Sequence, residues 1–378
     1  MLTKQLQLKS LDELTAERLA PLMELKPQLL FLFAASKYFR DTALAEHLTK
    51  LLPNCERIGC STSGEITMQS GYEDSISLTA LRFDDPAFTV VTTELQDMDD
   101  SMAAGRRISA QLRNNLPHTV LLFAPGTDIN GSHLVEGLIA ASPKTRIAGG
   151  LAGDGLDFKS TFTLYNNRVS PRQIVAVAFM GKNIVANFGS YGGWRPFGPV
   201  RRVTRAANNV LFELDGEPAL DVYKRYLGKY ASQLPASAFL FPFSILNADR
   251  QEAGLIRTIL KINESDGSLT LAGNVHDNGF LQLMNASTDA LVNGAATSAV
   301  AAHAAIKGQG FGLMISCVGR KLVMGGRTEE ELEAVIDELG SNHAYAGFYS
   351  YGEISPGNAD VGCSLYNQTM AVTFLGEK

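Results

Sequence analysis

The sequence predicts a mixed α/β (α+β) protein with two lobes, built from duplicated strand-helix-strand-turn-strand units whose mixed sheets are covered by helices. Three observations lead to this prediction: the chain has 378 residues, a glycine followed by an acid recurs three times, and the same pattern flanks each recurrence. A single hydrophobic core stops growing at roughly 250–300 residues, so the length favours two lobes. The recurrences carry the most weight, because internal self-similarity identifies a repeated architecture.

The repeated motif is a run of small residues that ends in a glycine and an acid. The aligned pairs are Gly64-Glu65 in R-I-G-C-S-T-S-G-E, Gly153-Asp154 in R-I-A-G-G-L-A-G-D and Gly352-Glu353 in Y-A-G-F-Y-S-Y-G-E. One interpretation is structural: the glycine supplies a positive φ or a close backbone approach, and the acid accepts hydrogen bonds from nearby amides. The other places the three turns around a ligand pocket. We favour the structural one, since a motif present in every copy is best explained by the fold that all copies share.

The flanks of the motif predict the elements of each unit. An apolar strand candidate comes first (29–34, 120–124, 312–317), then a helix candidate (41–52, 132–141, 328–339), and another strand candidate follows each motif (75–83, 174–180, 370–375). Asp41 is a suitable N-cap for the first helix, and Thr328 with Glu331 matches a capping box at the start of the third.

The spacing of the motifs suggests how the units are distributed. Gly64 and Gly153 are 89 residues apart, whereas Gly153 and Gly352 are 199 apart, which leaves room for a fourth unit beginning near residues 239–243. A turn at residues 214–218 precedes a helix candidate at 219–227 and marks the expected lobe boundary. We therefore expect an N-terminal helical extension at 1–27, a first domain at 28–216 and a second at 217–378.

Composition excludes several classes of protein. A formal net charge of −6 gives no electrostatic reason to bind nucleic acid or anionic lipid. No apolar run approaches the roughly 20 residues of a membrane span, and the first residues do not resemble a secretory leader, so we expect no membrane span and a cytoplasmic location. The four cysteines form no C-x-x-C pair, which argues against a disulfide framework or a structural zinc site.

Several motifs together resemble the FIST domain, a bacterial sensory module with an N-terminal and a C-terminal half. They are residues 59–65 and 149–154 in the first half, and 214–219, 316–320, 347–354 and 367–369 in the second. The resemblance covers nearly the whole chain beyond residue 28. It assigns residues 28–216 to the FIST N-terminal domain and residues 217–378 to the FIST C-terminal domain.

The resemblance implies a role in signal transduction rather than catalysis. The chain resembles the stand-alone kind, which includes haem proteins that sense nitric oxide and regulate a partner histidine kinase. This implies haem b as cofactor, a histidine kinase or other signalling output protein as partner, and a homodimer as one arrangement. The alternative is a sensor of an amino acid or another metabolite without haem. We do not expect an enzyme, because the chain shows no P-loop, G-x-S-x-G motif, metal-spaced histidine cluster or triad.

The candidate ligand-binding residues come from the motifs and from the unrepeated segment between them. The motif-derived candidates are Cys60, Glu65, Asp154, Cys317, Tyr351, Glu353 and Asn367. Trp194 is expected to form an aromatic wall, and Arg195 or Arg320 to pair with a carboxylate or a haem propionate. Arg320 follows a predicted strand, where open α/β sheets place ligands. Cys60 and Cys317 lack a nearby base in the sequence, so buried, unreactive thiols are the favoured interpretation.

Two histidines are candidates for the iron ligand of a haem. His303 lies on an alanine-rich helix predicted at 295–307, where small neighbours leave space beside an imidazole. His276 lies in a turn next to Asp277, which can orient a ring nitrogen. The alternative for both is an ordinary packed or surface histidine.

Overall fold

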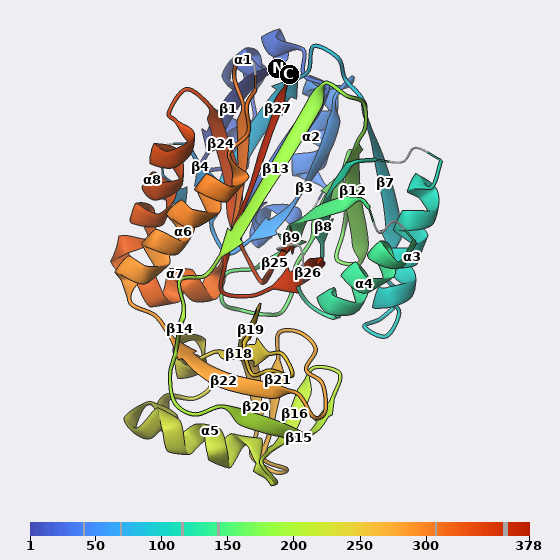
Figure 1. Cartoon of the computed structure of the whole chain (residues 1–378). Coiled ribbons are helices and arrows are strands. Elements are labelled where there is room, and N and C mark those ends of the chain that lie inside the picture. The colour runs from blue at the N-terminus through green and yellow to red at the C-terminus, as the bar shows by residue number, and fades with distance from the viewer. Residues whose placement is uncertain (41, 69, 115–116, 142–143, 307, 358–361) are drawn as a thin grey trace.

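The protein consists of a body with three mixed sheets and a smaller lobe with one antiparallel sheet (Figure 1). The computed structural model describes all residues except 41, 69, 115–116, 142–143, 307 and 358–361. Each sheet of the body has six strands, and the sheet of the lobe has nine. The predicted class, with repeated units and helix-covered mixed sheets, is confirmed. Within the described residues, no helix is both long and apolar enough to cross a membrane.

The body is built from three units of similar order: strand, helix, strand, turn and three further strands, with a second helix between the first two strands of the third unit. The first unit contains β2 (Leu29–Ala35), α2 (Ala43–Leu51), β3 (Glu56–Thr62), β4 (Glu65–Thr67), β5 (Gly71–Tyr72) and β6 (Ile76–Arg82). The second contains β8 (Thr119–Ala124), α4 (Gly131–Ala141), β9 (Arg146–Leu151), β10 (Thr163–Tyr165), β11 (Arg168–Ser170) and β12 (Gln173–Phe179). The third contains β23 (Phe311–Cys317), α7 (Val318–Met324), α8 (Thr328–Leu339), β24 (Ala344–Ser350), β25 (Gly352–Pro356), β26 (Cys363–Tyr366) and β27 (Met370–Glu377).

A strand and a helix precede each unit and complete its sheet. They are β1 (Leu2–Leu8) with α1 (Ala16–Leu25), β7 (Phe88–Glu94) with α3 (Ser101–Leu112), and β13 (Ile184–Tyr191) with α6 (Thr288–Ala302). The strands β1, β7 and β13 pair antiparallel with β6, β12 and β27. Residues 1–27 therefore contain a sheet strand as well as a helix. In the third unit the smaller lobe is inserted between β13 and α6.

The three units are joined by an exchange of strands that closes a ring. The hairpin β4–β5 of the first unit extends the third unit's sheet through β24, and β25–β26 of the third extends the second unit's sheet through β9. In turn, β10–β11 of the second unit extends the first unit's sheet through β3. Each glycine-acid turn thus lies where the chain leaves its own sheet for a neighbour's, which explains why the motif occurs once per unit.

The centre of the ring is a cluster of phenylalanines contributed by all three sheets. Phe31 and Phe33 of β2 face Phe311 of β23 and Phe348 of β24, with ring centroids 5.3 and 4.8 Å apart. Phe123 of β8 completes the cluster, 6.1 Å from Phe31. The alternate residues of these strands pack against the helices on the outer faces. Burial on both faces explains why the strands are continuous apolar runs in the sequence.

Residues 194–285 form the inserted lobe, all of whose sheet pairings are antiparallel. Its strands are β14 (Arg195–Pro196), β15 (Arg201–Ala207), β16 (Val210–Leu214), β17 (Glu217–Pro218), β18 (Phe243–Leu246), β19 (Glu252–Arg257), β20 (Ile259–Asn263), β21 (Ser268–Leu271) and β22 (Phe280–Asn285), with helix α5 (Ala219–Leu227) on one side. The prediction of a fourth unit beginning near residues 239–243 is wrong. Residues 239–240 end a 3₁₀ helix, η4 (Ala236–Leu240), and β18 pairs antiparallel with β19 and β22.

Of the two predicted helix caps, one lies outside the described residues and the other is wrong. Asp41 lies outside the described residues, and α2 begins at Ala43. The capping box at Thr328 is not formed, because Arg327 is the N-cap and the Thr328 hydroxyl donates to the Gly325 carbonyl. Glu331 is instead buried against Arg320, since a buried cation is a stronger partner than a backbone amide.

Candidate functional site

The acids of the first and third turns hold their own turns together. Glu65 accepts hydrogen bonds from the hydroxyl of Thr62 and from the backbone N–H (3.1 Å) and hydroxyl of Ser75. Glu353 accepts from the hydroxyl of Ser350 (2.6 Å) and from the N–H (3.1 Å) and hydroxyl (3.0 Å) of Thr369. Both acids are fully buried, and burial raises the pKa of Glu65 to about 7 and that of Glu353 to about 8.

The acid of the second turn has a different role. Asp154 accepts hydrogen bonds from the backbone N–H groups of Phe158, Lys159 and Ser160, at 2.9, 2.9 and 2.7 Å, and from the hydroxyl of Tyr351. Burial acts to raise its pKa, but these donors outweigh burial and lower the pKa of Asp154, so the carboxylate is ionised. Asp154 therefore fixes the loop at residues 154–160.

A cleft of about 690 Å³, here called the turn cleft, opens at the carboxyl ends of β2 and β3. All three units contribute to it: the strand ends of the first, the loop that starts at Asp154 from the second, and α7 from the third. Its cationic residues are Lys37, Arg40 and Lys321, and its acidic residues are Glu65, Glu73, Asp74, Asp154 and Asp157. Of the predicted site residues, the turn cleft brings together Glu65 and Asp154.

Lys321 of α7 is the cation best fixed in the turn cleft. Its ammonium group donates to the Ser63 carbonyl at 2.9 Å, pairs with Glu73 at 2.6 Å and lies 5.1 Å from the centroid of the Tyr349 ring. The Ser63 hydroxyl donates to the Gly155 carbonyl at 2.8 Å, which joins the first turn to the second. Sequence reasoning missed Lys321, because a single lysine after Arg320 forms no recognisable pattern.

The inserted lobe covers the strand ends of the second and third units. Gln368 donates to the Thr258 hydroxyl (3.0 Å) and Arg257 to the Leu365 carbonyl (3.1 Å). Asn130 donates to the Asn274 side chain at 2.9 Å. The turn cleft, at the strand ends of the first unit, has none of these lobe residues in its lining. The fold therefore leaves it open.

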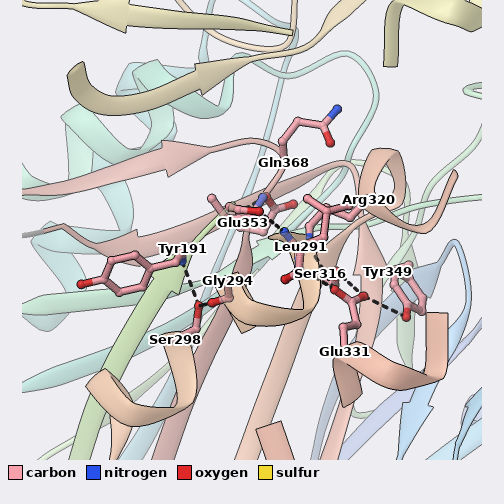
Figure 2. A network of polar contacts seen from close by, with 12 residues as sticks. Tyr191, Leu291, Gly294, Ser298, Ser316, Arg320, Glu331, Tyr349, Glu353 and Gln368 are labelled. Carbon is pink, nitrogen blue, oxygen red and sulfur yellow. Dashed lines mark hydrogen bonds and ion pairs between the residues drawn. The ribbon is translucent and has the colours of Figure 1, made fainter. Parts of the chain in front are cut away.

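Arg320 lies away from this cleft, inside a buried network (Figure 2). Its guanidinium pairs with Glu331 at 2.8 Å and donates to the carbonyls of Gly192 and Leu291, at 2.6 and 2.9 Å. Every nitrogen of the guanidinium is thus engaged within the protein, and the side chain is fully buried. A ligand carboxylate would have to displace these partners, so the geometry assigns Arg320 an internal role.

The two candidate thiols are also internal. Cys60 and Cys317 are both buried, and burial raises the pKa of each thiol well above its ordinary value. Neutral thiols are poor nucleophiles. The placement agrees with the interpretation of both residues as small core side chains.

Trp194 lines a second cleft of about 630 Å³ between the body and the inserted lobe, here called the lobe cleft. Its indole N–H donates to the Gln368 carbonyl at 2.8 Å. Arg195 is exposed on β14. Asn367 is only 1% exposed, and within the described structure neither atom of its amide has a hydrogen-bond partner. Tyr351 lies elsewhere: its ring stacks on Phe158 with centroids 4.2 Å apart.

The two candidate haem ligands are exposed and lie outside both clefts. The helix predicted at 295–307 ends at Ala302, and His303 follows as its C-cap; Lys307 lies outside the described residues. His276 lies in a turn, where its carbonyl accepts from the N–H of Gly279. Neither histidine lines the turn cleft or the lobe cleft. In the described part of the chain, no three His, Cys, Asp or Glu side chains are grouped to hold a metal ion.

Comparison with solved structures corrects one prediction. A cyanuric acid hydrolase from A. caulinodans is similar over 100% of this chain and 99% of its own, with 9% identity and a TM-score of 0.36. The prediction that the chain is not an enzyme is therefore wrong as an exclusion: the absence of familiar catalytic motifs does not decide the question. No curated protein has a significantly similar sequence.

Comparison with family models identifies the chain. The FIST N domain matches residues 28–217, and the FIST C domain matches residues 219–356. FIST domains sense small ligands in signal transduction, so a sensory, ligand-binding role follows at this level. The two matches cover most of the chain, which therefore belongs to the FIST family.

Proposed function

We propose that this protein senses a small zwitterionic ligand of the amino-acid type, bound in the turn cleft. The observation that carries the proposal is the meeting of cationic and anionic groups from all three units in one open cleft. A zwitterion needs both kinds of group, at a spacing that a small cleft provides. Lys321 is the candidate partner for the ligand's carboxylate, and the acidic residues of the same lining are candidates for its ammonium group.

The charges of the turn cleft can be exchanged for those of a ligand. The Glu73 partner of Lys321 is 75% exposed, and the Lys37–Asp74 pair joins two exposed side chains at 3.3 Å. Exposed ion pairs of this kind contribute about 0–1 kcal/mol to stability. A ligand carboxylate can therefore replace Glu73 on Lys321 at little cost, while the Ser63 carbonyl keeps the ammonium in place.

A ligand bound in the turn cleft can affect the inserted lobe through a chain of residue contacts. Asp154 lines the cleft and starts the loop that carries Phe158. Phe158 stacks on Tyr351 of the body and on Phe239 of the lobe, with centroids 4.2 and 6.1 Å apart. A ligand that moves this loop changes the contact between body and lobe. We propose that a partner protein, either a histidine kinase or another signalling protein, recognises the change in this contact.

Calorimetry and thermal shift with the common L-amino acids test the binding site. We expect at least one of them to bind and to raise the unfolding temperature, because a ligand of the folded state stabilises it. Lys321→Gln should weaken binding at least ten-fold, whereas Lys182→Gln, at an exposed position outside the cleft, should not change it. The proposal fails if none of the amino acids binds, or if Lys321→Gln binds as tightly as the wild type.

The haem form of the sensor has weaker support. It rests on the resemblance to nitric-oxide-sensing family members, and neither candidate iron ligand lies in an enclosed site: His276 and His303 are exposed and line neither cleft. An absorption spectrum after haem reconstitution tests it. A Soret band that shifts with nitric oxide and weakens in His303→Ala or His276→Ala would support haem, and no Soret band would remove it.

A further inference from the structure

We infer that the lobe cleft is a second ligand site, which takes an aromatic molecule that is neutral or positively charged. This goes beyond the proposed function, because the lobe cleft is a separate cavity with a different lining. It lies between β13 and β26 of the body on one side and β19 and β22 of the inserted lobe on the other. Its volume of about 630 Å³ is in the range of small-molecule sites.

Aromatic and other apolar side chains form much of the lining. The body contributes Phe188, Tyr191 and Tyr366, and the lobe contributes Trp194, Ile256 and Met284. Trp194 is held in place by its hydrogen bond to Gln368 and by the backbone of Gly192, where any side chain would collide with the indole. Fixed aromatic walls favour a flat, apolar ligand body, because aromatic pairs add about 0.5–1.5 kcal/mol to area burial.

The charge of the lining determines which aromatic molecules fit. Glu252 is the only charged side chain among the described lining residues, which include no lysine, arginine or histidine. A carboxylate or phosphate ligand would therefore meet no cation and one anion. An amine would meet Glu252 and the electron-rich faces of the aromatic rings. The turn cleft differs, because its lining contains three cationic residues as well as acidic ones.

Two polar groups at the lobe cleft lack partners in the described structure. The Ser190 hydroxyl is buried without a hydrogen bond, and Ser190 lines the cleft. The Asn367 amide is likewise unpartnered; Asn367 does not itself line the cleft, but the preceding residue, Tyr366, does. A buried polar group without a partner costs about 1–3 kcal/mol, so each such group calls for an explanation, and a bound ligand is one. A ligand hydroxyl or amine at Ser190 would supply one missing hydrogen bond.

Three probes with the same ring and different charge test the inference: 2-phenylethylamine, 2-phenylethanol and 3-phenylpropionate. Trp194 is the only tryptophan of the chain, so its fluorescence reports on this cleft alone. We expect a saturable change in its emission with the amine and the alcohol, and at least ten-fold weaker binding of the carboxylate. Calorimetry measures the same affinities without relying on the tryptophan. Absence of binding by both the amine and the alcohol, or equal binding of the carboxylate, would overturn the inference.

Variants of the lining locate the bound probe. Ala253→Phe fills the cleft and should abolish binding, while Glu252→Gln should remove the preference for the amine over the alcohol. Ser190→Ala should weaken binding about five-fold without lowering the unfolding temperature, because the hydroxyl has no partner in the described protein. It also keeps the test valid if Ala253→Phe does not fold. Lys321→Gln, in the turn cleft, should leave probe binding unchanged. Unchanged binding in both Ala253→Phe and Ser190→Ala, or loss of it in Lys321→Gln, would place the probe elsewhere.

Discussion

Arg320 and Glu331 form an ion pair in which neither side chain has any exposed surface. Two guanidinium nitrogens of Arg320 lie 3.0 and 2.8 Å from the same carboxylate oxygen. Arg320 also donates to Gly192, just before the inserted lobe, and to Leu291, just after it. The pair therefore ties both connections of the lobe to the third unit. Figure 2 labels Arg320 with Glu331 and Leu291.

Breaking this pair should be strongly destabilising. Glu331→Gln or Arg320→Met leaves a buried charge or buried acceptors unpaired, and each should lower the free energy of unfolding by about 3–5 kcal/mol in denaturant titrations. Replacing both residues together, as in Arg320→Met with Glu331→Leu, should lower the free energy of unfolding by much less than the sum of the two single-variant losses. Glu264→Gln, which breaks the exposed Lys224–Glu264 pair, is the control and should cost less than about 1 kcal/mol. A single-variant cost as small as the control would contradict a stabilising role for the buried pair.

The sequence predicted the units well because their elements are local. An apolar strand, a capped helix and a small-residue turn each leave a pattern within about ten residues. The exchange of β4, β10 and β25 between units was not predictable, since each pairs with a strand far away in the chain. The inserted lobe was missed for a related reason: spacing shows how much chain is present, not how its strands pair.

The candidate site was predicted only in part. The motif led to Glu65 and Asp154, which line the turn cleft, but Glu331 was interpreted as part of a capping box. Its true partner, Arg320, lies 11 residues earlier, and only the path of the chain from α7 to α8 brings the two together. Lys321 points into the cleft from the same helix, and no local pattern separates it from its neighbour.

Stability should fall as the pH rises through the neutral range. Glu65 and Glu353 have pKa values raised to about 7 and about 8 by burial, so the folded chain keeps protons that the unfolded chain releases near pH 4.5. Their contribution is fully present below about pH 4.5 and is lost as the pH rises toward 7 and 8. Each group contributes at most about 1.4 kcal/mol per pH unit.

Denaturant titrations at pH 5, 6, 7 and 8 measure how steeply the free energy of unfolding falls with pH. Glu65→Gln with Glu353→Gln should flatten this slope, because an amide can retain the hydrogen bonds of a protonated carboxyl without titrating. Glu17→Gln, at an exposed position on α1, serves as the control and should keep the wild-type slope. An unchanged slope in the double glutamine variant would show that other groups govern the pH dependence.

The contact of Tyr351 with Asp154 should govern the order of the loop at 154–160. Tyr351→Phe removes one donor to the Asp154 carboxylate but keeps the ring stacked on Phe158, so we expect a loss of about 1–2 kcal/mol. Asp154→Ala removes the acceptor of three backbone N–H groups and should cost more. Hydrogen exchange of the backbone amides of residues 158–160 should accelerate more in Asp154→Ala than in Tyr351→Phe. Equal protection in Asp154→Ala and wild type would mean that the loop is held by other contacts.

Two of the motif glycines, Gly153 and Gly352, should differ in their tolerance of a side chain, although the sequence makes them look alike. A Cβ at Gly153 would lie 2.3 Å from the Ser63 hydroxyl oxygen and 2.8 Å from its backbone nitrogen, which is itself bonded to the Tyr349 carbonyl. Because that backbone cannot yield, Gly153→Ala should lower the free energy of unfolding by about 2–3 kcal/mol.

A Cβ at Gly352 would meet only the ends of Leu365 and Leu151, at 3.0 and 3.2 Å, so Gly352→Ala should cost less than Gly153→Ala. Gly326→Ala is the matched control: its φ is not positive, nothing lies within 4 Å of the added carbon, and stability should not fall. Chemical denaturation of the three variants ranks them directly. If Gly153→Ala is no less stable than Gly352→Ala, the close approach of the first and second turns is not what requires glycine at position 153.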